Sequence, residues 1–209
     1  TNRGTDYLMP KPRRKYTRPP GKRRYRNLFI IAAEGQTEIQ YFNIFNNRQS
    51  VMHIECLKGK KDSSPDQVLK RMVKRLVEEK LRESDQAWLV VDKDEWTNDQ
   101  LQQLYNWSIK SDKYGFALSN PKFEYWLLLH FEDGKGIESS RNCSDRLERY
   151  LPDYKKHIEV QKFTPEQISD SVSRAKRRDN PPCVDWPRVV GSTTVYWLVE
   201  EILMLEKDC

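Results

Sequence analysis

Residues Leu28 to Phe42 read LFIIAAEGQTEIQYF, and they pass from a continuous apolar run to a charged stretch within a few positions. The run that ends before Glu34 has the length and the unbroken apolar character of a buried strand. After Gly35, the apolar residues Ile39 and Phe42 have the spacing of one face of a helix. The segment therefore predicts a strand, a tight turn and a helix, with a carboxylate where the strand ends.

The same alternation of strand-like and helix-like segments continues along the first part of the chain. Short apolar runs at residues 52–58, 86–92 and 114–119 predict three further strands. Apolar residues at helical spacing in 64–82 and 98–111 predict the helices between them. This order predicts an α/β fold with a mostly parallel sheet covered by helices, because parallel neighbours need crossover connections.

The fourth expected strand leads into NPKFEYWLLLHFED, residues 120–133, which is apolar nearly all round. Such a helix must be buried on several sides. We expect Asn120 to be the N-cap of this helix and Pro121 to occupy its first turn. His130 is expected to be a core or interface histidine rather than a metal ligand.

The rest of the chain is more polar and is expected to be mainly helical. Helices broken by loops are predicted over residues 134–187, and a last helix over 192–205, capped by Ser192 or Thr193. We therefore expect one α/β domain, residues 25–209, with a helical C-terminal extension that begins at about residue 134.

The start of the chain is strongly basic. Residues 1–27 contain ten Lys or Arg and one acid, Asp6, so they carry +9 in a chain whose net charge is +6. Few apolar groups and many Pro and Gly predict a flexible basic arm over residues 1–24. Such an arm, with Arg23 and Arg24 near its end, suits the phosphate backbone of a nucleic acid. The alternatives are a solubilising or targeting tail, or a segment that packs on a partner protein.

Two shorter basic runs are further candidates for contact with nucleic acid. LKGKK contains Lys58, Lys60 and Lys61, and SRAKRR contains Arg177 and Arg178. Runs of this kind are more often solvated faces than binding sites, unless they line one cleft.

Composition excludes several classes of protein. No apolar run approaches the roughly 18 residues needed to span a bilayer, and the N-terminal region lacks the apolar segment of a signal peptide. We therefore expect a cytoplasmic protein without membrane contact. The four cysteines form no CxxC pair and the three histidines are isolated, so neither a zinc site nor a disulfide framework is predicted.

Acidic residues mark the predicted strand ends. Glu34 ends the first strand with Glu38 one helical turn later, Asp92 and Asp94 end the third, and Glu124 lies in the helix after the fourth. In a parallel sheet these ends share one edge, so the acids should converge. Asp92 and Asp94 would point the same way in an extended continuation of the strand. Clustered carboxylates without His or Cys predict a site for Mg²⁺ or Mn²⁺.

Each of these acids also has an ordinary explanation. Glu34 and Asp92 could be solvated turn residues, and Glu124 could pair with Lys122 or lie exposed in the first turn of its helix. Gly35 favours the functional reading, because a glycine after the acid permits a tight turn and the close approach of a phosphate.

At this point the motifs resemble a known family. IIAAEGQTE followed by LVVDKDE resembles the Toprim domain, the metal-dependent catalytic module of topoisomerases, primases and several nucleases. EGQTEIQYF, VVDKDE, LSNPKFEYWLLLHFE and STTVYWLVEEIL, preceded by an Arg-rich arm, resemble the RloB family of bacterial defence proteins. The resemblance covers nearly all of the chain from Tyr25 onward.

The resemblance implies a Rossmann-like Toprim fold and a Mg²⁺-dependent nucleic-acid-cleaving activity in antiphage defence, often with an ATPase encoded alongside. It implies that Glu34 is the general acid or base and that Asp92 and Asp94 hold the metal. Glu38 could share the role of Glu34 or merely face solvent.

Two other functions compete with a nuclease. WLVVDKDEW resembles the strand and DxD motif of haloacid-dehalogenase-like phosphatases, but that motif normally opens its domain and Trp96 replaces the usual Thr or Val. The non-enzymatic alternative is a nucleic-acid-binding or adaptor subunit. The sequence leaves open whether the substrate is DNA or RNA, tRNA included, and whether the protein is a homo-oligomer.

Overall fold

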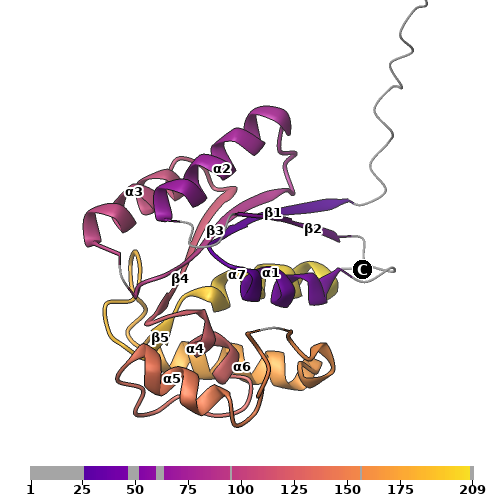
Figure 1. Ribbon diagram of the computed structural model, residues 1–209. Coiled ribbons are helices and arrows are strands. Elements are labelled where there is room, and N and C mark those ends of the chain that lie inside the picture. The colour runs from indigo at the N-terminus through magenta and orange to yellow at the C-terminus, as the bar shows by residue number, and fades with distance from the viewer. Residues whose placement is uncertain (1–25, 47–51, 60–63, 95, 156, 208–209) are drawn as a thin grey trace, which may run out of the picture.

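The computed structural model describes residues 26–46, 52–59, 64–94, 96–155 and 157–207 (Figure 1). The predicted basic arm with Arg23 and Arg24, as well as Lys60 and Lys61, lies outside the described residues.

Five strands of the described chain form one sheet in the order β2-β1-β3-β4-β5. The first four are mutually parallel, and β5 runs antiparallel to β4. The predicted mostly parallel sheet is therefore confirmed, in a Rossmann-like α/β fold. The strands are β1 (Asn27–Ala33), β2 (Met52–Leu57), β3 (Gln86–Asp92), β4 (Tyr114–Asn120) and β5 (Ser192–Thr193).

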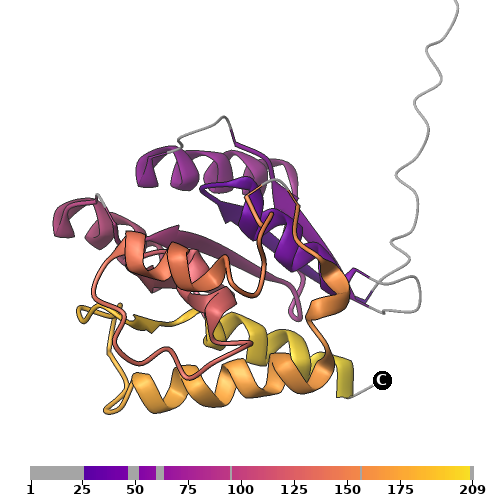
Figure 2. The same cartoon turned by 60° about the horizontal axis from the view of Figure 1, so that its bottom comes forward.

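Helices cover both faces of the sheet (Figure 1). Helices α2 and α3 lie on one face, α1 and α7 lie on the other, and α4, α5 and α6 pack beyond them. Figure 2 shows α6 running along α7. The helices are α1 (Gln36–Phe42), α2 (Pro65–Glu78), α3 (Asn98–Ser108), α4 (Phe123–Leu128), α5 (Ser140–Leu147), α6 (Pro165–Arg178) and α7 (Val195–Lys207), with short 3-10 helices η1 (Asn43–Phe45) and η2 (Val160–Lys162).

Strand β1 explains why the sheet is buried on both faces. All seven of its residues are buried, and alternate side chains enter different cores. Leu28 and Ile30 pack with α2 and α3, whereas Phe29 and Ile31 pack with α1, α4 and α7. Because successive side chains of a strand point to opposite faces, a continuous apolar run is what this position requires.

His130 is a core histidine, as expected. Its side chain is buried, and Nδ1 lies 3.0 Å from the carbonyl oxygen of Trp126, to which it donates. Nε2 is then the acceptor for the Tyr41 hydroxyl at 3.1 Å. Burial lowers the pKa of His130 to about 3, so the ring is neutral at physiological pH.

The predicted helix cap at Asn120 is wrong, and pairing between β4 and β5 explains why. Asn120 ends β4 and pairs with Ser192 of β5, and its Nδ2 donates to the carbonyl of Pro187 at 3.3 Å. The following helix α4 begins only at Phe123. Ser192 and Thr193 are likewise strand residues, although Oγ1 of Thr193 accepts the backbone N–H of Val195, the first residue of α7, at 3.2 Å. The C-terminal segment therefore contributes a strand to the sheet as well as helices.

Within the described ranges, no helix has both the length and the apolar character needed to cross a lipid bilayer.

Candidate functional site

Four acids gather where the parallel strands end. Glu34 follows β1 directly and Asp92 is the last residue of β3, the neighbour of β1 in the sheet. Two residues separate the end of β1 from helix α1, which carries Glu38, and α4 carries Glu124 shortly after β4. We call Glu34, Glu38, Asp92 and Glu124 the acidic cluster.

The acids of the cluster perturb one another. Burial raises the pKa of Asp92 well above its usual value, and the negative charges of Glu38, Glu34 and Glu124 raise it further. The pKa of Glu34 rises to about 8, mainly through burial and then through the charge of Glu38. Burial also raises the pKa of Glu38 to about 7, where the charge of Glu124 adds to it and nearby backbone N–H groups partly offset it. Glu38 is buried and Glu34, Asp92 and Glu124 are half-buried, so the cluster lies in a poorly solvated region.

Two neutral donors orient the acids at the strand ends. The indole Nε1 of Trp96 donates to Oε1 of Glu34 at 2.8 Å. The backbone N–H of Phe123, the first residue of α4, donates to Oδ1 of Asp92 at 2.8 Å. Each bond fixes one oxygen of its carboxylate, so the two side chains are held at the edge of the sheet.

A cation lies beside Glu34. Nη2 of Arg71, on α2, donates to the carbonyl of Ala33 at 2.6 Å, which anchors the guanidinium at the end of β1. Its charge lowers the pKa of Glu34, although burial and Glu38 outweigh it. Arg71 thus offsets part of the negative charge on this side of the acidic cluster.

Gly35 is favoured by space rather than by backbone conformation. Its φ is −125°, a value that any residue adopts. A Cβ at this position would lie 3.0 Å from Oε2 of Glu38, which is closer than an ordinary contact. The glycine therefore lets Glu38 fold back towards the end of β1.

Asp94 stands apart from the acidic cluster. Strand β3 ends at Asp92, the chain bends at Lys93, and Asp94 lies in a turn rather than in an extended continuation of the strand. The exposed Asp94 side chain accepts a hydrogen bond from Ser140 Oγ at 2.6 Å. Its assignment as a metal ligand stays a prediction.

A family model described as RloB-like protein matches residues 29–202 of the chain. The chain belongs to the RloB-like protein family. No curated protein and no solved structure matches it. The matched segment of this RloB-like protein runs from β1 into α7 and contains all four members of the acidic cluster as well as Asp94.

The acidic cluster fits a hard divalent cation in the kind of donors that it offers. Carboxylate oxygens suit Mg²⁺ or Mn²⁺, and a cation would neutralise charges that now repel one another. Among the described residues, no three His, Cys, Asp or Glu side chains are arranged around a common point as metal ligands. Binding an ion in the RloB-like protein would therefore require carboxylate side chains to rotate towards it.

The predicted basic residues lie at different places on the RloB-like fold. Lys58 is exposed just after β2, at the same edge of the sheet as the acidic cluster. Arg177 is exposed in the last turn of α6, and the half-buried Arg178 donates to the carbonyl of Gly191 at 3.4 Å. Their contact with nucleic acid stays a prediction.

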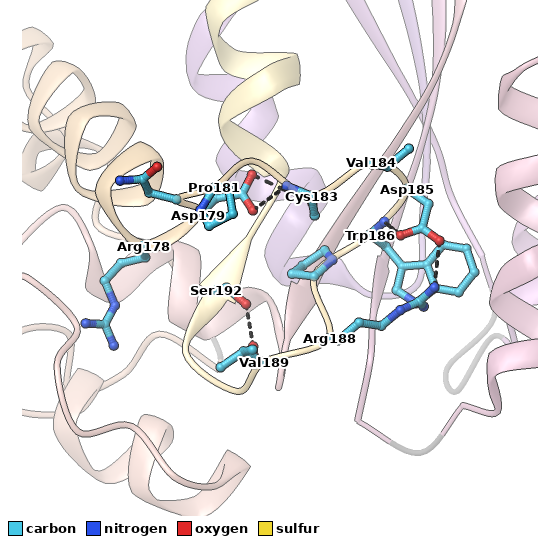
Figure 3. Close-up of a pocket in the computed structure, with 12 residues that line it drawn as sticks. Arg178, Asp179, Pro181, Cys183, Val184, Asp185, Trp186, Arg188, Val189 and Ser192 are labelled. Atoms are coloured by element: carbon cyan, nitrogen blue, oxygen red, sulfur yellow. Dashed lines mark hydrogen bonds and ion pairs between the residues drawn. The ribbon is translucent and has the colours of Figure 1, made fainter.

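A pocket of about 420 Å³ lies along the loop between α6 and β5 (Figure 3). The Arg188 guanidinium stacks on the Trp186 ring at 3.6 Å and pairs with Asp185 at 2.6 Å. Arg178 lines the rim, but no member of the acidic cluster does. The pocket is therefore separate from the acids that suggested a function.

Sequence reasoning missed two residues that contact the site. Trp96 appeared only as a departure from a phosphatase motif, although an indole just after LVVDKDE was a visible signal. Arg71 is one of several basic residues in a helix, and nothing in its spacing distinguishes it. Only the packing of α2 on β1 reveals it.

Proposed function

We propose that this RloB-like protein is a Toprim-type, divalent-metal-dependent phosphodiesterase that cleaves nucleic acid as an effector of antiphage defence, together with an ATPase partner. The acidic cluster is the observation that carries the proposal. Buried and half-buried carboxylates at the carboxyl edge of a parallel sheet are costly to a fold, and such groups cluster at functional sites.

Under this proposal, Asp92, Glu38 and Glu124 hold Mg²⁺ or Mn²⁺, with Asp94 and Glu34 as further ligands. When bound, the ion neutralises charge on the non-bridging oxygens of the phosphate. Glu34 is placed to act as a general acid or base, because it lies at the strand end beside the other acids and Trp96 fixes one of its oxygens. Whether Glu34 binds the ion or moves the proton is the chemical question that the site poses.

The direct test is cleavage of DNA and of tRNA by the purified protein with Mg²⁺ or Mn²⁺, with and without any ATPase encoded beside it. We expect cleavage of at least one substrate that stops when EDTA is added. Cleavage that persists in EDTA would contradict a metal-dependent reaction. Binding without cleavage under every condition would favour a nucleic-acid-binding or adaptor subunit.

Deletion of residues 1–24 tests the basic arm separately. We expect the truncated protein to bind nucleic acid more weakly and with a shallower dependence on salt, because each Lys or Arg that contacts phosphate releases counterions. The measurement is fluorescence anisotropy of a labelled oligonucleotide over a series of salt concentrations. An unchanged salt slope would mean that the arm does not touch phosphates.

A further inference from the structure

Lys122 occupies the segment between β4 and α4, among residues of the site. The next residue, Phe123, donates its backbone N–H to Asp92, and Glu124 follows. A positive side chain is therefore built into the same short segment that supports the acidic cluster.

The ammonium group of Lys122 is held in place by α5. Its Nζ donates to Oγ of Ser144 at 2.6 Å, and the same oxygen accepts a hydrogen bond from the Tyr154 hydroxyl at 3.1 Å. Ser144 is 7% exposed and Tyr154 is 1% exposed, so this anchor is rigid. A lysine held in this way loses less conformational entropy when it binds an anion than a free surface lysine would.

The surroundings of the Lys122 anchor also feel the charges of the acidic cluster. Burial raises the pKa of the Cys143 thiol to about 12, with Glu124 and Asp92 raising it further and Lys122 lowering it. Burial also raises the pKa of Tyr154, and the charge of Glu124 adds to the effect. Glu124, Asp92 and Lys122 therefore all act on the Cys143 thiol, whereas Arg71 acts on Glu34.

The simpler explanation is that Lys122 only compensates the charge of the acids. However, the hydrogen bond that holds its ammonium goes to a neutral hydroxyl, and an ammonium has three donors. The charge is therefore available to an anion that enters the site. A substrate phosphate needs such a group, because the acidic cluster by itself repels a polyanion.

We propose that Lys122 binds a non-bridging oxygen of the substrate phosphate at the acidic cluster, and that Ser144 and Tyr154 are positioning residues for it. The inference rests on the proposed phosphodiesterase function and extends it, because it assigns recognition to the phosphate rather than to a base. A compact ammonium suits a single phosphate oxygen, without reading sequence.

The test measures binding, separately from cleavage. A labelled single-stranded oligonucleotide, in DNA and in RNA form, is titrated in Ca²⁺ over a series of salt concentrations. We expect Lys122→Met and Lys122→Gln to bind about tenfold more weakly, as for the loss of one charged hydrogen bond. We also expect the slope of log affinity against log salt to fall by about 0.7. Lys122→Arg should retain the slope of the wild type.

Lys113 provides a matched control. It is also half-buried and flanks β4, but at the opposite end of the strand. Lys113→Met should bind like the wild type. Ser144→Ala keeps every charge, so it should retain the salt slope while affinity falls severalfold, and an unchanged affinity would overturn its positioning role.

The proposal would be overturned if both neutral Lys122 variants kept the affinity and the salt slope of the wild type. It would also be overturned if the wild type did not bind the oligonucleotide. Absence of cleavage in a protein that binds as expected would instead contradict only the phosphodiesterase function. Circular dichroism of each variant confirms that it is folded, and the two neutral substitutions guard against a local packing defect in either one.

Discussion

Asp92→Asn is expected to lower nucleic-acid cleavage by about a thousandfold and, in the same protein, to raise the melting temperature at pH 8. The two effects have one cause. The Asp92 carboxylate is held among three other acids in a poorly solvated region, which is unfavourable for folding and suited to holding a cation.

Asparagine is the informative replacement because it keeps the shape and one of the hydrogen bonds. Its amide oxygen can still accept from the backbone N–H of Phe123, as Oδ1 of Asp92 does at 2.8 Å. Only the charge is removed, so repulsion from Glu34, Glu38 and Glu124 is relieved. Loss of activity with gain of stability is typical of a residue kept for function at a cost to the fold.

The measurements are single-turnover cleavage and thermal unfolding in metal-free buffer at pH 8. Asp85 is a matched control, because it precedes β3 as Asp92 ends it. Asp85 is fully buried and accepts the backbone N–H groups of Leu28 and Arg82 through its two oxygens. Asp85→Asn turns one acceptor into a donor and should lower the melting temperature, without a loss of cleavage by the protein that remains folded. An Asp92→Asn protein that is less stable and fully active would contradict the site.

The features that the sequence predicts well are those that depend on short-range pattern. The strand Gln86–Asp92 has the predicted bounds and the strand Asn27–Ala33 ends where predicted, because buried parallel strands are unbroken apolar runs. The convergence of Glu34 and Asp92 also follows from the sequence, because parallel neighbours end at one edge. The sequence pattern does not show which strands are neighbours. The structure shows that β1 and β3 are adjacent, which brings Glu34 close to Asp92.

The features that the sequence predicts poorly depend on contacts between distant segments. Asn120 has the chemistry of an N-cap, but pairing with Ser192, far along the chain, extends β4 through it. The site shows the same limit. The spacing of Asp92 and Asp94 predicts that their side chains point the same way. The chain bends after the strand, however, and Asp94 accepts a hydrogen bond from Ser140. Ser144 and Tyr154 had no motif, since only the packing of the C-terminal helices brings them to Lys122.

Without divalent metal, the protein is expected to lose stability as pH rises from about 5 to about 8. In the folded state the pKa of Glu34 is about 8 and that of Glu38 about 7, against an ordinary value of 4.5. Between these values the folded protein holds protons that the unfolded chain has released. Unfolding then releases protons and becomes more favourable as pH rises. For each proton that the folded protein retains, the free energy of unfolding falls by about 1.4 kcal/mol per pH unit.

The measurement is thermal unfolding in EDTA across this pH range, where a slope of that size lowers the melting temperature by roughly 3 to 5 °C per pH unit in a domain of this length. Glu34→Gln should flatten the dependence, because it removes one of the groups that hold a proton in this pH range. Mg²⁺ or Mn²⁺ competes with protons for the same oxygens, so it should stabilise the protein more at pH 8 than at pH 5. If the melting temperature rises with pH, these carboxylates are not the groups that hold the protons. If Glu34→Gln and Asp92→Asn leave the stabilisation by metal intact, they are not the groups that hold the ion.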